Sequence, residues 1–339
     1  MGRVRKQADR WMPERVYRGK SAYEYRPTNG HCIKLCSIDS PRSLVLRRHA
    51  DEYERFHAGR HTIGAMVSEY FDSSQFAKLS QTTRDDYAKH WKNIKKVFQK
   101  TDARKLKPEH VRKYMDLKGK SSENQANHHH SFLSAAFSWG YERGKVSANP
   151  CKGVKKFKIE ARDRYIEDHE YKALYDHASI AVQVAMEISY LCAARQGDVL
   201  ALTRDQILPE GIKIKQGKTG KLQVKRWSPR LRAAIELAKQ IKTANPSTII
   251  IPTRTGAPYS SDGFRTMVAK AKKKAREATG LAMDFTYHDI KAKSISDYEG
   301  NKQEFSGHKT YSQVAIYDRK PQVVDSLNVP NINDNQKGK

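Results

Sequence analysis

The stretch that decides the fold is SGHKTYSQVAIYDR, residues 306–319. It contains the pair Gly307-His308 and, nine residues after the histidine, Tyr317. A nearer tyrosine, Tyr311, follows the histidine by three residues. A histidine followed by a tyrosine is a weak signal by itself, so its meaning depends on the segments that precede it.

One preceding segment is FTYHDIK, residues 285–291. If Thr286 caps a helix, His288 and Lys291 are three residues apart and share one face of that helix. The segment therefore predicts an imidazole and an ammonium on the same side of a helix.

A β-hairpin is predicted further upstream, because apolar residues alternate over 212–214 and 222–224 on either side of a turn. The turn contains the tripeptide Gly-Lys-Thr at 217–219, which also occurs in nucleotide-binding P-loops. That class is excluded, because a P-loop needs a glycine five positions before Gly217 and Ile212 stands there. Lys218 is instead placed to act as a movable cation or a proton donor.

The earliest segment is LCAARQGDVL, residues 191–200. Val184, Ile188, Leu191 and Cys192 form an apolar helical stripe, and Arg195 falls on the same face. An arginine there either contacts the carbonyls at the end of the helix or is held at the edge of the core for an anion. The segment alone leaves both interpretations open.

The four segments in this order resemble the tyrosine recombinase family, in particular the integrases of temperate phages. The resemblance covers most of residues 160–320. It implies that Arg195 clamps the scissile phosphate, that Asp198 supports it, and that Tyr317 is the nucleophile. It also implies that Lys218 protonates the leaving 5′-oxygen and that three side chains contact phosphate oxygens: His288, Lys291 and His308.

The chemistry of this family explains the residue types. Attack on a phosphodiester adds negative charge, so preorganised cationic donors supply most of the catalysis. The phosphotyrosine product conserves the energy of the broken bond, so neither ATP nor a metal ion is implied. The sequence departs from the family in two ways: a lysine, Lys291, stands where an arginine is usual, and the interval from Lys291 to His308 is short.

The charge of the chain agrees with a nucleic-acid partner. It carries 64 Lys and Arg against 37 Asp and Glu, a formal net charge of +27, and basic residues are in excess along its whole length. Such a distribution is typical of proteins whose domains all contact nucleic acid, with a merely soluble basic surface as the alternative. No stretch approaches the roughly 18 apolar residues of a membrane span. With no signal-peptide pattern either, we expect a cytoplasmic protein in its host bacterium.

The cysteines and histidines do not indicate a metal site. Cys32 and Cys36 lack a second pair that would complete a zinc site, and we expect them to be small buried residues. The run His128-His129-His130 lacks acidic or cysteine partners. We expect solvated polar side chains there, with contact to DNA as the alternative, and we expect no cofactor.

The N-terminal region, residues 1–60, is predicted to be a small α+β domain. Residues 22–25 and 33–35 alternate as strands do, residues 28–30 form a turn, and Ser40-Pro41 begins a charged helix that runs to about His57. The resemblance implies that this domain binds arm-type DNA sites.

Residues 62–152 are predicted to be wholly helical, like the family's core-site DNA-binding domain. The clearest helix is expected to start at Thr83, with Asp86 as its capping-box partner. Its lysines form a stripe that is either a solvated face or a DNA contact: Lys89, Lys92, Lys96 and Lys100. A later helix is expected to bury Leu133, Ala136, Phe137 and Tyr141.

A hydrophilic hinge is expected at 152–158, where Lys152, Lys155 and Lys156 are further candidates for DNA contact. A mixed α/β, mainly helical catalytic domain follows over 160–339. Its tail, from residue 318, either packs on a neighbouring protomer or is disordered.

The whole sequence thus predicts a multidomain integrase that works as a homotetramer on double-stranded attachment sites. Strands would be exchanged through a Holliday junction, with a host DNA-bending protein and a directionality factor as further partners. Two rivals stay open: a type IB-like topoisomerase, which needs no second DNA specificity, and a catalytically degenerate DNA-binding relative.

Overall fold

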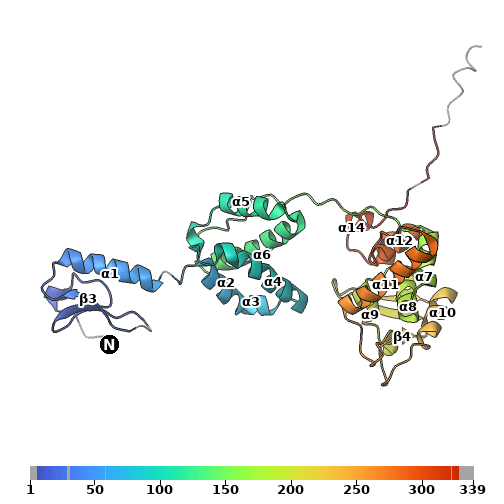
Figure 1. The fold of residues 1–339 in the computed structure, drawn as a ribbon, viewed down its shortest axis with the longest axis horizontal. Coiled ribbons are helices and arrows are strands. Elements are labelled where there is room, and N and C mark those ends of the chain that lie inside the picture. Colours follow the sequence, from blue (N-terminus) through green and yellow to red (C-terminus); the bar gives the residue numbers. More distant parts are fainter. Residues whose placement is uncertain (1–5, 29–30, 58, 322, 328–339) are drawn as a thin grey trace, which may run out of the picture. The chain divides into compact units, whose positions relative to one another are not determined.

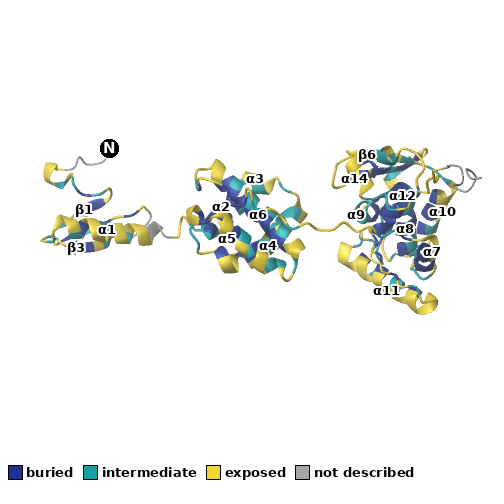
Figure 2. Ribbon diagram, turned by 90° about the horizontal axis from the view of Figure 1, so that it is seen from above, coloured by how far each residue is buried: buried dark blue, intermediate teal, exposed yellow. Residues whose placement is uncertain are grey.

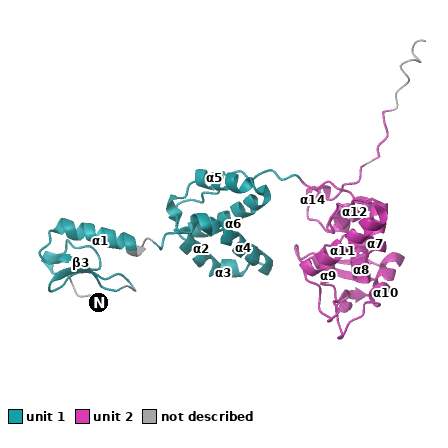
Figure 3. Cartoon of the chain, in the orientation of Figure 1, with its two compact units in different colours: residues 1–160 teal, residues 161–339 magenta. Residues whose placement is uncertain are grey.

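A computed structural model of the chain describes residues 6–28, 31–57, 59–321 and 323–327. The chain divides into two compact units, residues 1–160 and 161–339 (Figure 3). The elements follow one another as labelled in Figure 1, and each unit is described here by itself.

The first part of unit 1 is an antiparallel sheet with one helix. The strands lie in the order β1 (Val16–Arg18), β2 (Ala22–Tyr25) and β3 (Ile33–Ser37), and α1 spans Arg42–His57. These bounds confirm the two predicted strands and the helix, whereas β1 was not predicted. Asn29 and Gly30 of the expected turn lie outside the described residues.

The small core of this part is lined by residues that alternate along the strands, among them Val16, Tyr25 and Leu35. The prediction that Cys32 and Cys36 are buried is wrong. Cys32 is exposed and Cys36 is half-buried, because Cys32 precedes β3 and its thiol donates to Glu24 Oε2 at 3.2 Å instead of entering the core.

The second part of unit 1 is helical and has its own core. Its helices are α2 (Ile63–Phe71), α3 (Ser74–Ala77), α4 (Gln81–Phe98), α5 (Pro108–Gly119) and α6 (Glu123–Glu142). α4 begins two residues before the predicted Thr83, because Ser80 Oγ accepts from the Thr83 N–H and so caps the helix. Tyr141 is exposed, contrary to prediction, since it lies at the end of α6 beyond the core.

The histidine run also differs from the prediction. His129 and His130 are buried in α6. His129 Nδ1 lies 2.8 Å from the Tyr114 hydroxyl, and His130 Nε2 lies 3.2 Å from the Cys151 carbonyl oxygen. Burial lowers the pKa of His129 to about 4. These two histidines are therefore neutral parts of the helical core.

The predicted hinge at 152–158 is wrong in position. The Asn127 side chain accepts from the Phe157 N–H and donates to the Phe157 carbonyl, both at 2.9 Å. Arg112 donates to the Lys155 carbonyl and lies over the Phe157 ring. The stretch up to residue 157 is thus fastened to α5 and α6, and the exposed connection is residues 158–163.

Unit 2 packs most of its helices around one central helix, Ile180–Cys192, and carries a small antiparallel sheet in the order β4 (Ile207–Leu208), β5 (Gly211–Lys215) and β6 (Leu222–Arg226). Its helices are α7 (Asp168–Asp176), α8 (Ile180–Cys192), α9 (Gln196–Leu200), α10 (Pro229–Ala238), α11 (Ser261–Thr279), α12 (Asp289–Asp297), α13 (Lys302–Ser306) and α14 (Tyr311–Ala315). α8 and α12 are the most deeply buried (Figure 2).

The predicted hairpin is confirmed, since Lys215 pairs with Leu222 across the turn. Much of the expected tail, residue 322 and residues 328–339, lies outside the described residues. Within the described ranges, no helix has the length and apolar character needed to cross a bilayer.

Candidate active site

Arg195 lies in the turn between α8 and α9. α8 ends at Cys192, and the next residue, Ala193, has a left-handed φ of 50°, so the chain leaves the helix before the arginine. Arg195 is extended and directly precedes α9. The predicted continuation of the α8 stripe to Arg195 is therefore wrong, but its side chain is 17% exposed and Nη1 donates to Gln216 Oε1 at 2.9 Å. The guanidinium is thus held by a side chain at the edge of the core.

Asp198, in the first turn of α9, fixes the hairpin turn against this arginine. Its Oδ1 accepts from the Gly217 N–H at 2.8 Å, and its Oδ2 is 4.0 Å from Arg195 Nη1. Lys218, the next residue, is exposed. Among the described residues it makes no hydrogen bond or ion pair. The backbone of the hairpin turn is therefore held in place next to Lys218, but the Lys218 side chain forms no hydrogen bond or ion pair with Arg195 or Asp198.

Gln216 connects three parts of the site and was not singled out from the sequence. Its Oε1 accepts from Arg195 and from Thr219 Oγ1, while its Nε2 donates to the Ser306 carbonyl at 3.0 Å. An amide can accept and donate at once, which suits this buried position. The sequence did contain a signal for Gln216. This residue continues the alternation of Ile212 and Ile214, which indicates that its polar side chain faces inward.

The first turn of α12 carries His288 and Lys291. The predicted shared face assumed that Thr286 caps this helix, but the Thr286 oxygen does not cap it. The Thr286 N–H and hydroxyl both donate to Asp289 Oδ2, at 2.7 and 2.8 Å. His288 Nε2 lies 3.2 Å from the Tyr317 hydroxyl, and Lys291 Nζ lies 5.8 Å from the centre of the Tyr317 ring.

His308 follows a tight turn at Gly307. Gly307 has a φ of 70°, and a Cβ there would lie 2.5 Å from Gln216 Nε2, so only glycine fits. His308 Nδ1 is 2.8 Å from Ser306 Oγ, and its ring stacks on Tyr317 with 4.9 Å between ring centres. The nearer tyrosine, Tyr311, is 71% exposed. The structure thus brings Tyr317, and not Tyr311, to His288, Lys291 and His308.

Two buried donors in this cluster have no partner. Among the described residues, neither Lys291 Nζ nor His308 Nε2 has a hydrogen-bond partner, and Nε2 is a donor when Nδ1 accepts from Ser306 Oγ. A buried polar atom without a partner costs free energy, and native structures rarely tolerate it without a ligand or water. Together with Arg195, these donors form a site suited to an anion with several oxygens.

The electrostatics of the cluster agree with this. Burial, reinforced by the positive charge of Arg195, lowers the pKa of Lys291 to about 7. Burial also lowers the pKa of His308 to about 4, with Lys291 and Arg195 adding to the effect. The pKa of His288 is lowered by burial and by Lys291. An anion would relieve the repulsion that causes these shifts.

A second buried lysine, Lys225 on β6, was missed from the sequence. Its Nζ donates to the Phe305 carbonyl and lies 4.7 Å from the centre of the Phe305 ring. Burial lowers its pKa. This contact joins the sheet to α13, just before His308. The described residues contain no cluster of three or more His, Cys, Asp or Glu suited to a metal ion.

The lysines predicted to contact DNA from unit 1 are all exposed: Lys89, Lys92, Lys96, Lys100, Lys152, Lys155 and Lys156. Lys89 lies 3.8 Å from Asp86, and Lys156 donates to Ser131 Oγ at 2.8 Å. The others have no side-chain partner among the described residues. They belong to a different unit from the anion site.

A mainly helical domain with a small sheet, in which an arginine, two histidines, a lysine and a tyrosine converge, has the features of a tyrosine recombinase. Comparison with known proteins agrees, since residues 164–322 match the phage integrase family. Most of unit 2 is therefore similar in sequence to that family.

Its relatives include the integrase of Escherichia phage HK022, 30% identical over 202 residues, and that of Escherichia phage lambda, 25% identical over 205 residues. Each alignment covers 55% of this chain and 56% of the relative, so the chain spans about half the length of these relatives.

Solved structures of lambda integrase share the fold. Residues 75–356 of that protein, as a dimer bound to a COC′ core site, match with a TM-score of 0.67 at 20% identity, covering 79% of this chain and all of the other. The lambda integrase tetramer bound to a Holliday junction matches with a TM-score of 0.63 at 19% identity, covering 88% and 96%.

Proposed function

We propose that this protein is a site-specific DNA recombinase that cleaves and rejoins DNA through a 3′-phosphotyrosine at Tyr317, and so integrates or excises a phage or mobile element. The observation that carries the proposal is the pair of buried, unpartnered donors on Lys291 and His308, beside Arg195 and in contact with the Tyr317 ring. Such a site suits a phosphodiester held against a phenol.

The reaction follows from these positions. The Tyr317 oxygen attacks phosphorus, the bond from phosphorus to the 5′-oxygen breaks, and the phenolic proton leaves. His288 Nε2, 3.2 Å from the hydroxyl, is the nearest acceptor for that proton, and its lowered pKa keeps it neutral near pH 7. The leaving 5′-oxygen takes a proton from Lys218 once the hairpin turn closes on DNA.

The charge that develops on the phosphate is met by Arg195, Lys291 and His308. These donors are preorganised because Asp198 and Gln216 hold the arginine and Ser306 holds the histidine. A 5′-hydroxyl of another strand reverses the reaction and seals the DNA. The bond energy is kept in the phosphotyrosine, so the cycle needs no ATP.

The remaining assignments extend this proposal to the whole chain. Residues 1–60 would bind arm-type sites, residues 62–152 would bind the core site through their exposed lysines, and residues 160–339 would cleave. Four protomers would act together on attachment sites of double-stranded DNA in the host nucleoid, with a DNA-bending protein and a directionality factor. The tetramer of lambda integrase on a Holliday junction supports this stoichiometry.

The test uses a nicked core-site duplex, with the site taken from the DNA that flanks the gene. Cleavage releases a short fragment from this duplex, so the strand cannot be rejoined and the covalent adduct accumulates. The parent should form a covalent adduct, and Tyr317→Phe should form none while binding DNA equally well. Tyr311→Phe is the matched control and should behave like the parent. Recombination of a plasmid with two sites separates a recombinase from a topoisomerase, and absence of any adduct would identify a DNA-binding protein without activity.

A further inference from the structure

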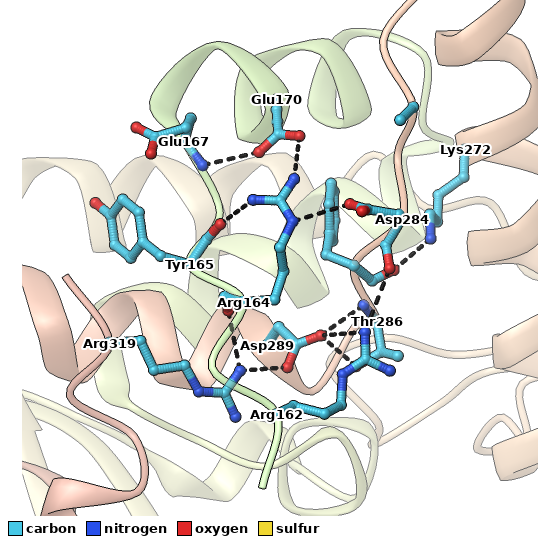
Figure 4. A network of polar contacts seen from close by, with 12 residues as sticks. Arg162, Arg164, Tyr165, Glu167, Glu170, Lys272, Asp284, Thr286, Asp289 and Arg319 are labelled. Atoms are coloured by element: carbon cyan, nitrogen blue, oxygen red, sulfur yellow. Dashed lines mark hydrogen bonds and ion pairs between the residues drawn. The ribbon is translucent and has the colours of Figure 1, made fainter. Parts of the chain in front are cut away.

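Arg319, two residues after Tyr317, is buried in a network behind the active site (Figure 4). Its side chain is only 8% exposed, and Nη1 donates to Asp289 Oδ1 at 2.6 Å. The same nitrogen donates to the Arg164 carbonyl at 3.0 Å. Nε donates to the Ile316 carbonyl at 3.3 Å, and a buried guanidinium with three acceptors fixes the path of the chain on which it lies.

The carboxylate of this pair also orients the helix of the active site. Asp289 is the first residue of α12 and directly follows His288. Its other oxygen accepts from Thr286, and Arg162 approaches it to 3.7 Å (Figure 4). Burial alone would raise the pKa of Asp289, but the hydrogen bonds from Thr286 and Arg319 outweigh burial and lower it. The carboxylate therefore stays ionised and holds both α12 and the segment after Tyr317.

A second contact with α12 lies about two turns further along the helix, at Ser296. Ser296 Oγ donates to the Tyr317 carbonyl at 3.1 Å and accepts from the Arg319 N–H at 2.8 Å. The backbone on the C-terminal side of the nucleophile is thus hydrogen-bonded to the helix that presents His288 and Lys291. On the N-terminal side, the five-residue helix α14 buries Val314 against Ala193 and Ile295, so the Arg319 network supplements an apolar contact with α12.

We infer that Arg319 is a positioning residue, which fastens the segment after Tyr317 to α12 and so keeps the Tyr317 hydroxyl beside His288 in its own active site. The inference rests on the proposed function, since it assigns a role in delivering the nucleophile. It explains why a large cation is buried at this place when it does not touch the cluster of phosphate donors.

The test compares Arg319→Ala with the parent in single-turnover cleavage of the trapped duplex at saturating DNA. A displacement of about 1 Å can cost ~100-fold in rate, so we expect a loss of that order in the cleavage rate, with DNA affinity unchanged. Arg319→Lys keeps one charged contact to Asp289 and should recover part of the rate. A purely structural role would change the amount of folded protein but not the rate per bound protein.

The matched control is Arg230→Ala. Arg230 forms a two-pronged pair with Glu187, a carboxylate that is 7% exposed, between α10 and α8 and without contact to Tyr317. Its loss should lower the melting temperature but leave the cleavage rate of bound protein unchanged. Asp289→Asn should slow cleavage, and combining it with Arg319→Ala should add little, because both changes break the same contact.

The outcomes separate the inference from the function on which it rests. If the parent forms no adduct that depends on Tyr317, the proposed function is refuted and the inference falls with it. If the parent forms the adduct but Arg319→Ala cleaves as fast as Arg230→Ala, only the positioning role is overturned. Additive effects of Arg319→Ala and Asp289→Asn would also overturn it.

Discussion

Replacing Lys291 by arginine should remove the part of a proton uptake on DNA binding that we expect this lysine to contribute in the parent. Lys291 Nζ is buried without a partner, near Arg195, and burial lowers its pKa to about 7. Asp198 opposes this shift, whereas Lys225 adds to it. A phosphate oxygen beside Nζ would restore the charged form, so the lysine should take up a proton as DNA binds. An arginine is charged in both states.

The size of the effect follows from that pKa. At pH 8 the free protein would hold roughly a tenth of a proton on Nζ, and a phosphate that restores the ordinary pKa would raise this to nearly one. The uptake should therefore be about 0.9 proton per active site at pH 8 and about 0.1 at pH 6. The difference between 10.5 and about 7 corresponds to about 5 kcal/mol that the phosphate relieves, at roughly 1.4 kcal/mol per pKa unit.

The assay is calorimetric titration of the core-site duplex in buffers with different ionisation enthalpies. The slope of the binding enthalpy against the buffer enthalpy gives the number of protons taken up. Lys291→Arg serves as the control, since uptake by His288 and His308 is common to both proteins. Equal slopes for the parent and Lys291→Arg at pH 8 would refute the reasoning and would mean that Lys291 is already charged in the free protein or never meets the phosphate.

Three further predictions concern other parts of the chain. Lys218→Ala should slow cleavage by about 100-fold or more, which is the scale of one lost transition-state donor. A substrate with a 5′-thiol leaving group, which needs no proton, should restore much of the rate. If it does not, Lys218 is excluded as the acid. Limited proteolysis of the free protein should cut first within 158–163, with DNA protecting that segment, and a first cut within 152–157 would contradict the packing on α5 and α6. Lys96→Ala should weaken core-site binding alike for all sequences and reduce the salt slope by about one, whereas an unchanged slope would make it a solvated residue.

The sequence was most informative where chemistry restricts residue types. The ordered motifs predicted that Tyr317, His288, Lys291 and His308 belong to one site, and the structure brings these four side chains together. The hairpin and the helix that ends at Cys192 followed from the periodicity of apolar residues. These features depend on local pattern, which a single chain displays directly.

The contacts that hold these residues could not be predicted, because they join segments distant in the chain. Gln216 bonds to Ser306, 90 residues away, and Arg319 bonds to Asp289, 30 residues away. The strand alternation indicates that Gln216 faces inward, but it does not name the partners of that amide, and the sequence around Arg319 shows no comparable pattern. The same limit explains the buried histidines of α6, whose partners, Tyr114 and Cys151, lie outside the helix.

If both units bind DNA as proposed, the exposed connection at 158–163 affects how long the protein stays bound. Six residues span at most about 20 Å when extended. Once either unit has bound, the other is confined to a small volume around its own site, which amounts to a local concentration in the millimolar range for a short linker. The protein then leaves the DNA only when both units are dissociated at the same time. Lengthening the connection would therefore shorten residence on DNA even though no contact to DNA is altered.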